Sequence, residues 1–241
     1  MNIVVTMPTF NEAENIGRMI DVLIKDIFPK IKNHKMMLLV VDDKSPDGTG
    51  EIVKKHKEVF LLEGNKEGLG RAYARGFRYA IDELKADAVM EMDADFQHDP
   101  NDIPRFVKEF DNGADYVIGS RYIPGGSIPK EWGFKRVFLS VGGNLFTRVT
   151  LWLWEVHDFT TGYRLARVKG FLDHLDFEKI FSKSYAYKMR LLYEMKRQGA
   201  KIVEIPINFA AREKGWSKMD SDDFFESLKV IAQIWKERLL A

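Results

Sequence analysis

Cysteine is absent from the 241-residue chain. A protein without thiols forms no disulfide, has no thiolate nucleophile and offers no zinc–cysteine site, so a reducing compartment such as the cytosol is favoured. An excess of either charge is also missing, because 37 Lys and Arg residues balance 36 Asp and Glu residues to a net charge of +1. This balance argues against a nucleic-acid partner and against a broad polybasic membrane patch. Any positive surface must therefore be local.

A long hydrophobic run is missing as well. The most apolar stretch, residues 137–156, is interrupted by two glycines, Arg148 and Glu155, and it falls short of the roughly 18 consecutive apolar residues that indicate a transmembrane helix. The amino terminus leads into a strand-like segment, residues 3–5, instead of the basic and apolar regions of a signal peptide. What is present is 45% hydrophobic content. This is enough for one large core, and we expect one compact domain with appendages.

Strand-like runs alternate with helical patterns in the first half of the chain. The runs span residues 2–7, 36–41, 59–62, 88–92 and 116–119. Apolar residues recur at helical spacing between them, and Asn11 with Glu14 forms a capping-box-like start to the first helix. This order predicts an α/β fold with a parallel sheet, in which ligands bind at the carboxyl ends of the strands.

The second half of the chain has a looser pattern. A loop rich in glycine and proline at residues 124–129 precedes a tryptophan-rich segment, residues 132–154, which we expect to be helical. The remaining pattern predicts a strand at 159–165, a helix at 185–198, an edge-like strand at 202–209 and a last helix from Asp220 or Ser221.

Two aspartates follow the strand-like run at 88–92. Asp93 and Asp95 can turn toward one point if the chain bends at Ala94, and two carboxylates so close repel unless a cation lies between them. A hard cation such as Mg²⁺ or Mn²⁺ fits, because it takes oxygen ligands and is usually completed by water and substrate phosphates; Gln97 could add a carbonyl oxygen. The alternative is an acidic turn that caps the next helix, where Asp99 precedes a proline.

Other polar residues admit two interpretations. Asp42 and Asp43 either terminate a strand or hold a ribose or base edge, as acidic groups at strand ends do in nucleotide sites. His98 is interpreted as a surface or turn histidine, because an all-oxygen site suits the hard cations. Four cations are either solvated charges or parts of an anion site, since Arg binds phosphate through a bidentate fork. They are Arg121, Lys135, Arg136 and Arg212.

Glycine-rich and aromatic patterns are equally open. Gly68–Gly70 fails the dinucleotide fingerprint, because Tyr73 stands where that motif needs a small residue. The segment is a glycine-rich helix start, whose N-terminus could still face a diphosphate. Aromatic residues at 132–154 and 224–235 either face the core or, because Lys and Arg accompany them, lie in a membrane interface.

Several motifs together follow the pattern of one enzyme family along nearly the whole chain. The segments are 8–12, 40–49, 65–70, 92–98, 119–122, 161–164, 204–207 and 212–219. They resemble the dolichol-phosphate mannose synthases, which are inverting, metal-dependent glycosyltransferases of the GT-A fold. The Asp-Ala-Asp of residues 93–95 is shared by many nucleotide-sugar transferases. The Ser-Pro-Asp-Gly-Thr and Arg-Glu-Lys-Gly-Trp-Ser-Lys-Met stretches indicate the lipid-phosphate branch more narrowly.

The resemblance implies a Rossmann-like α/β fold, with a mainly parallel sheet and helices on both faces. The catalytic domain would span residues 1–219, with residues 132–154 inserted as a membrane-interface helix, and residues 220–241 would form a carboxyl-terminal amphipathic interface helix. The implied reaction moves mannose from GDP-mannose to dolichyl (polyprenyl) phosphate with inversion. The implied localisation is the cytosolic face of a membrane.

The resemblance also implies roles for particular residues. The nucleotide sugar would be held by Pro8, Phe10, Glu12, Val40, Asp42, Asp93 and Ala94. A Mg²⁺ or Mn²⁺ ion would be held by Asp93, Asp95 and Gln97. The acceptor phosphate would be received by Arg121, Arg136, Ser140, Arg212 and Lys218. The groups expected to act in the transfer itself are Asp95, Arg121, Arg136 and Arg212.

Three questions stay open from the sequence. Some members of that family carry carboxyl-terminal transmembrane helices, and this chain ends at Ala241 without one, so we expect either peripheral binding or an anchoring partner or missing segment. The nucleotide sugar could instead be another one, such as UDP-glucose, or the chain could be an inactive binding subunit. No general base is expected, because a phosphate monoester is already largely ionised. If a base were needed, Asp158 would be the candidate. We expect the substitution Asp158→Asn to leave the rate largely intact.

Overall fold

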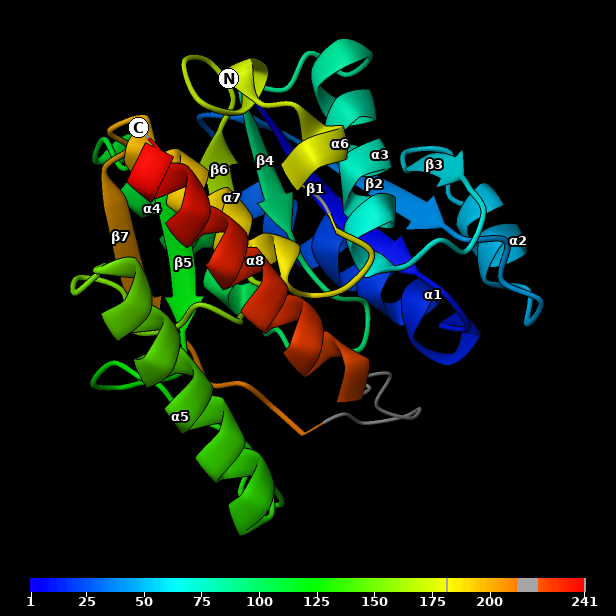
Figure 1. Cartoon of the computed structure of the whole chain (residues 1–241). Helices are drawn as coiled ribbons and strands as arrows, with labels where there is room; N and C mark the ends of the chain where they lie inside the picture. The colour runs from blue at the N-terminus through cyan, green and yellow to red at the C-terminus, as the bar shows by residue number, and fades with distance from the viewer. Residues whose placement is uncertain (181, 212–220, 241) are drawn as a thin grey trace.

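The computed structural model describes residues 1–180, 182–211 and 221–240. Seven strands form one sheet in the order β3-β2-β1-β4-β6-β5-β7, as Figure 1 shows. The strands are β1 (Asn2–Thr9), β2 (Lys35–Asp42), β3 (Phe60–Glu63), β4 (Ala88–Glu91), β5 (Tyr116–Ser120), β6 (Arg164–Arg167) and β7 (Ile202–Pro206). β6 lies antiparallel between β4 and β5, and the other pairs are parallel.

Helices connect these strands. They are α1 (Ala13–Asp21), α2 (Thr49–Lys54), α3 (Leu69–Asp82), α4 (Ile103–Asp111), α5 (Phe134–Leu151), α6 (Phe177–Ile180), α7 (Tyr187–Arg197) and α8 (Ser221–Leu240). A π-helical turn, Val22–Ile27, continues α1, and short 3-10 turns occupy Phe28–Lys30, Pro100–Asp102 and Leu172–His174.

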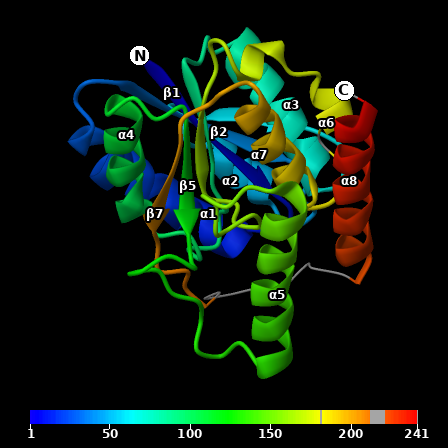
Figure 2. The same ribbon diagram turned by 60° about the vertical axis from the view of Figure 1, so that its left-hand side comes forward.

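The core lies on both faces of the sheet, because successive side chains of a strand point to opposite sides. Ile3 and Val5 of β1 pack against α1, α2 and α4, whereas Val4 belongs to the cluster that includes α3, α6 and α7. Figure 2 shows the two layers of helices. The predicted α/β class with helices on both faces is confirmed.

The capping box predicted at Asn11 and Glu14 is wrong. Asn11 has a left-handed backbone (φ 56°), and the N–H groups at the start of α1 are instead bound by the loop after β2 and by the first residue of α2. Asp47 Oδ2 accepts from Ala13 N (2.9 Å), and Thr49 Oγ1 accepts from Glu12 N (3.0 Å). The loop after β2 therefore fixes the end of β1.

Two predicted strands have different bounds. Residues 159–163 do not extend β6, because the N–H groups of Thr160 and Thr161 donate to the Asp158 carboxylate (3.2 and 3.0 Å) and shape a turn. β7 ends at Pro206, and beyond it Ile207 and Phe209 bond to Ser127, which is part of the loop after β5.

α5 projects away from the sheet (Figure 1 and Figure 2). Only Asn144, Thr147 and Leu151 of this 18-residue helix are buried. α8 contacts its carboxyl-terminal end, where Trp235 Nε1 donates to the Thr150 carbonyl (2.7 Å). Among the described residues, no helix is both long and apolar enough to span a bilayer.

Candidate active site

Strained turns mark the carboxyl ends of three neighbouring strands. Asn11, Lys44 and Phe96 follow β1, β2 and β4, and each has a positive φ (56°, 52° and 61°). Non-glycine residues rarely adopt this conformation, and such strain collects at functional sites. Arg18 of α1 packs over the Phe96 ring, with its guanidinium carbon 4.6 Å from the centroid. These turns bend the chain so that strand-end side chains share one pocket.

That pocket, the strand-end pocket, has a volume of about 280 Å³. Its lining includes Pro8, Thr9, Phe10, Glu12, Asp43, Lys66, Gly68, Leu69, Asp93, Ala94, Asp95, Lys183, Ser184 and Tyr185. Five of the seven residues predicted to hold the nucleotide sugar are among them; Val40 and Asp42 are not. Lys66 Nζ lies 3.8 Å from the centroid of the Phe10 ring at this pocket.

Asp42 stabilises the turn behind the pocket instead of lining it. Its Oδ1 accepts from Thr9 Oγ1 (2.9 Å) and Ser45 Oγ (2.6 Å), and its Oδ2 accepts from Ser45 N (2.9 Å). Val40 is fully buried in the core. The carboxylate that the structure brings to the pocket is that of the next residue, Asp43.

Asp43 is held by Arg75 of α3, whose Nη2 donates to Asp43 Oδ1. Burial raises the pKa of Asp43, and Arg75 opposes this effect. Arg75 reaches across Gly64, where a Cβ would lie only 2.5 Å from its Nη2. A side chain at position 64 would therefore require the Arg75 guanidinium to shift.

Asp93 and Asp95, the two carboxylates predicted to hold the metal, both line the pocket. Asp95 is 1% exposed and accepts from Gln97 N through Oδ1 (3.1 Å). Among the described residues no three His, Cys, Asp or Glu side chains converge as metal ligands. Two carboxylates nevertheless fit Mg²⁺ or Mn²⁺, because such ions commonly keep waters and bind substrate phosphates. Gln97 is directed elsewhere: its Nε2 donates to the Ala210 carbonyl (3.1 Å), and it is not part of the pocket lining.

His98 lies in the turn after β4, one of the two places considered for it, but it is buried and does not lie on the surface. It is 1% exposed, stacks on Tyr163 at 4.7 Å between ring centroids, and accepts from Asp93 N through Nδ1 (3.1 Å). Burial lowers the pKa of His98 to about 3, although the Asp95 charge opposes this. A neutral His98 therefore helps to fix the Asp93 backbone.

A second group of polar side chains lies at the end of β5. Arg121 is 8% exposed and forms a bidentate pair with Asp158, through Nε to Oδ2 (2.7 Å) and Nη2 to Oδ1 (2.8 Å). Burial raises the pKa of Asp158, but Arg121 and backbone N–H groups outweigh it and hold that pKa below the usual 3.8. A carboxylate so stabilised is a poor proton acceptor. Asp158 positions Arg121 instead.

Glu204 of β7 in turn supports Asp158. Its Oε1 accepts from the N–H groups of Asp158 (2.9 Å) and His157 (3.0 Å). Its Oε2 bonds to His157 Nδ1 (2.7 Å). Glu204 lies in the segment 204–207 that carried the resemblance, but nothing in the sequence indicated that it contacts residue 158.

Arg136 and Ser140 of α5, which are predicted to receive the acceptor phosphate with Arg121, lie near Arg121. The guanidinium carbons of Arg136 and Arg121 lie 4.0 and 5.9 Å from the Trp132 ring centroid. Ser140 Oγ bonds to Tyr122 OH (2.6 Å). We call these five residues the arginine–tryptophan cluster. Two further residues predicted for the acceptor, Arg212 and Lys218, lie outside the described residues.

Arg164 lies beneath both groups and has no exposed surface. Its Nη1 donates to the Lys188 carbonyl (2.7 Å) and Tyr116 OH (3.0 Å), and its Nη2 donates to the Phe159 carbonyl (2.7 Å). Burial lowers the pKa of Lys188 to about 8, against the opposing effect of Asp93. Lys188 carried no signal in the sequence, where it falls inside a helical pattern.

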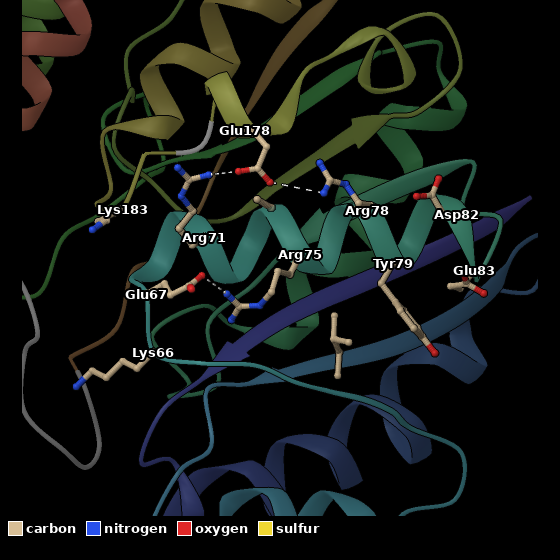
Figure 3. Close-up of a pocket in the computed structure, with 12 residues that line it drawn as sticks. Lys66, Glu67, Arg71, Arg75, Arg78, Tyr79, Asp82, Glu83, Glu178 and Lys183 are labelled. Atoms are coloured by element: carbon tan, nitrogen blue, oxygen red, sulfur yellow. Dashed lines mark hydrogen bonds and ion pairs between the residues drawn. The ribbon is translucent and has the colours of Figure 1, made fainter.

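A larger hollow, of about 840 Å³, lies along the outer side of α3, and Figure 3 shows its charged lining. Arg71 and Arg78 both pair with Glu178 (2.5 and 3.6 Å), and Arg75 pairs with Glu67 (3.3 Å). Because these cations are neutralised within the hollow, its size does not make it the better candidate.

Comparison with known proteins decides the family. The family model described as glycosyl transferase family 2 matches residues 4–175. The chain belongs to glycosyl transferase family 2.

The resemblance to phosphomannose synthases is confirmed by relatives. A polyprenol monophosphomannose synthase from Mycolicibacterium smegmatis is 34% identical over 95% of this chain and 85% of its own. An undecaprenyl-phosphate mannosyltransferase from Micrococcus luteus is 39% identical over 91% of this chain and 88% of its own.

A solved glycosyltransferase structure has a fold similar to the one described above. Glucosyl-3-phosphoglycerate synthase from Mycobacterium tuberculosis, solved with Mn²⁺, UDP-glucose and glycerol 3-phosphate, superposes with a TM-score of 0.62 at 21% identity. The match covers 98% of this chain and 79% of that one. The chain is therefore a glycosyltransferase of the GT-A fold.

Proposed function

We propose that this family 2 glycosyltransferase moves mannose from GDP-mannose to a polyprenyl phosphate. The observation that supports it most is the pairing of two sites at one sheet edge, an acidic strand-end pocket and a cationic arginine–tryptophan cluster. The first suits a metal-bound nucleotide sugar, and the second suits a phosphate. The names of the mannosyl-transferring relatives favour mannose and a polyprenyl phosphate.

In this proposal the pocket residues hold the donor. Asp43 offers a carboxylate to the nucleoside, and Asp93 and Asp95 carry the negative charge that a Mg²⁺ or Mn²⁺ ion requires. When bound, the ion would stabilise the diphosphate that departs. His98 and the backbone of Gln97 keep the two aspartates oriented toward the pocket.

The arginine–tryptophan cluster would receive the acceptor phosphate. Arg121 stays charged and fixed because Asp158 binds it on two nitrogens. A phosphate monoester has its second pKa near ~6, so the acceptor oxygen is already a nucleophile at neutral pH and needs no base. A single displacement then inverts the anomeric carbon and gives a β-mannosyl phosphate from the α-linked donor.

The amphipathic helix α5 would lie on the membrane that holds the lipid. Phe134, Phe138, Val141 and Leu145 form a stripe at helical spacing, and their exposed fractions are 85%, 66%, 45% and 56%. Arg136 and Ser140 lie on the same helix. The lipid phosphate would therefore meet its binding groups at the membrane surface.

A screen of nucleotide sugars tests the proposed reaction. We expect Mn²⁺-dependent transfer from GDP-mannose, and not from UDP-glucose, to a short polyprenyl phosphate, followed by chromatography of the lipid product. If transfer occurs only from UDP-glucose, the donor is UDP-glucose and not GDP-mannose. Absence of turnover with every donor would make the chain a binding subunit.

Replacement of the pocket aspartates tests the metal. Asp93→Asn and Asp95→Asn each remove one anionic ligand, and turnover is expected to fall by two orders of magnitude or more, about 10², with the fold retained by circular dichroism. Asp26→Asn, an exposed aspartate after α1, is the matched control and should keep full turnover. Full activity of the wild-type chain in excess chelator, or full activity of Asp95→Asn, would remove the metal from the mechanism.

A further inference from the structure

Lys188 is a buried cation with unused hydrogen-bonding capacity. It lies in the first turn of α7 and is 2% exposed. The Lys188 ammonium donates no hydrogen bond to any residue that the structure describes. It lies over the ring of Tyr185, with Nζ 4.9 Å from the ring centroid. An ammonium group carries three donors, and leaving them unmet in the interior is costly. An oxygen-rich ligand would satisfy them.

The neighbours of Lys188 hold its ammonium in one place. Arg164 binds the Lys188 carbonyl (2.7 Å), which fixes the backbone. A Cβ on Gly162 would lie 2.6 Å from Lys188 Nζ, so the ammonium occupies the space that the glycine leaves open. Tyr185, over which it lies, lines the strand-end pocket.

This place lies between the two sites. Gly162 lies two residues before β6. In the sheet β6 lies between β4 and β5, as Figure 1 shows. β4 leads to the Asp93 and Asp95 pair, and β5 leads to Arg121. A group that passes from a diphosphate at the first pair to a phosphate at Arg121 must cross this gap.

We propose that the Lys188 ammonium donates hydrogen bonds to hydroxyl oxygens of the transferred sugar, so that Lys188 binds the sugar and not the nucleotide. The inference rests on the proposed function, in which a sugar occupies the gap. The phosphates at either end have their own cationic partners, whereas the sugar is neutral. A lysine suits it, because three rotatable donors adapt to hydroxyl groups better than a planar guanidinium does.

Binding of GDP-mannose and of GDP to Lys188→Met, each with Mn²⁺ and measured by calorimetry, tests the assignment. Methionine has nearly the same shape and leaves no unpaired buried charge, so the fold should be kept. The dissociation constant for GDP-mannose is expected to rise about ten- to a hundredfold, as for one lost hydrogen bond from a charged group. That for GDP should stay within about twofold of wild type.

Lys196→Met is the matched control, because it makes the same replacement on an exposed side of α7, where Lys196 pairs with Glu155 (2.5 Å). It should leave both dissociation constants unchanged. Gly162→Ala is the second variant. Its methyl group displaces the ammonium at the flexible end of Lys188, and it should weaken GDP-mannose binding while sparing GDP.

Two results would overturn the assignment. If Lys188→Met weakens the binding of GDP and of GDP-mannose equally, Lys188 contacts the diphosphate or has only a structural role. Unchanged binding of both would exclude any contact. A wild-type chain that binds GDP-mannose and transfers no mannose contradicts the proposed function instead, and the comparison of Lys188→Met with wild type still decides where Lys188 acts.

Discussion

At the scale of single residues, Asp158 would serve the proposed acceptor site by positioning Arg121 and not by contacting the substrate. It accepts from Arg121 Nε, Nη2 and N, and from Thr161 N. The expectation that Asp158→Asn leaves the rate largely intact conflicts with these contacts, because an amide cannot keep the bidentate pair. We now expect the variant to lose acceptor affinity through a misplaced Arg121.

The variant Asp158→Asn is tested by measuring kcat and KM for the polyprenyl phosphate from about pH 6 to 9, because the acceptor phosphate is ionised over this range. KM should rise by about tenfold or more, as for one weakened charge-assisted contact, and high pH should not restore it. Breaking a buried pair costs about 3–5 kcal/mol of stability, so the assay is run where circular dichroism shows the variant folded. Asp111→Asn, a surface control paired with His34, should behave as wild type. Rescue at high pH would identify Asp158 as a base.

The same pair bears on stability at low pH. The pKa of Asp158 is lower in the folded chain than its ordinary 3.8. A group of this kind stabilises the folded state above its unfolded pKa, and the contribution is lost as the pH falls through the folded value. The Arg121–Asp158 pair should therefore persist down to about pH 4.

Some residue assignments followed from the sequence and others could not. Asp93 and Asp95 were predictable, because acidic residues after a buried strand face the ligand edge of a parallel sheet. Asp43 was not separable from Asp42, since the choice depends on a turn in which Ser45 and Thr9 bind Asp42. Lys188, which reaches this edge from a distant helix, left no local pattern.

At the scale of elements, α5 and α8 differ although both carry aromatic residues. Val230, Ile231 and Ile234 of α8 are buried in the core, whereas its aromatic residues Phe225 and Trp235 are 61% and 46% exposed, so the core-facing alternative holds for the aliphatic residues and not for these two. The stripe of α5 that begins at Phe134 is exposed. Helical periodicity predicts one apolar face in both helices. It does not predict whether that face packs against the core, because this depends on the tertiary structure.

Vesicle flotation tests the proposed membrane contact of α5. The triple variant Phe134→Ser, Phe138→Ser and Leu145→Ser removes three exposed apolar groups, each worth roughly 1–2 kcal/mol if buried in lipid. Binding to vesicles is expected to fall by an order of magnitude or more, about tenfold. Phe60→Ser on β3, where the ring is 37% exposed, is the control and should float as wild type. Unchanged flotation of the triple variant would contradict the assignment.

The strand β6 is the element that the sequence located least well. Its partners β4 and β5 pair with it in antiparallel register, Glu91 with Arg164 and Ile118 with Arg164. A β-α-β order predicts parallel neighbours, and an antiparallel strand inserted from far along the chain is set by long-range packing. Arg164, bound by three acceptors in the interior, anchors it.

At the scale of the whole molecule, the rising limb of turnover at acid pH should belong to the acceptor, because Lys188, whose pKa burial lowers to about 8, loses its charge only at higher pH. The pKa of Asp158 is lowered and that of His98 is about 3, so neither changes charge above pH 5. The rate at low acceptor concentration should rise as the pH passes ~6, where the phosphate becomes dianionic. A phosphonate acceptor, whose second ionisation lies higher, should move this limb upward. If the rising limb of the pH–rate profile does not move with the phosphonate acceptor, the group that titrates belongs to the protein.

The separation of the two halves of the site also has an optical consequence. All five tryptophans lie after residue 131, and Trp132, Trp152, Trp154 and Trp235 belong to or adjoin α5 and α8. Trp132 packs between Arg121 and Arg136, and the other three are 67%, 46% and 46% exposed. Emission from these four tryptophans, excited at the indole band, therefore reports on the half of the site proposed to face lipid and not on the strand-end pocket, whose described lining contains no tryptophan. Engagement of a vesicle should shift that emission to the blue, whereas GDP binding alone should leave its wavelength where it was.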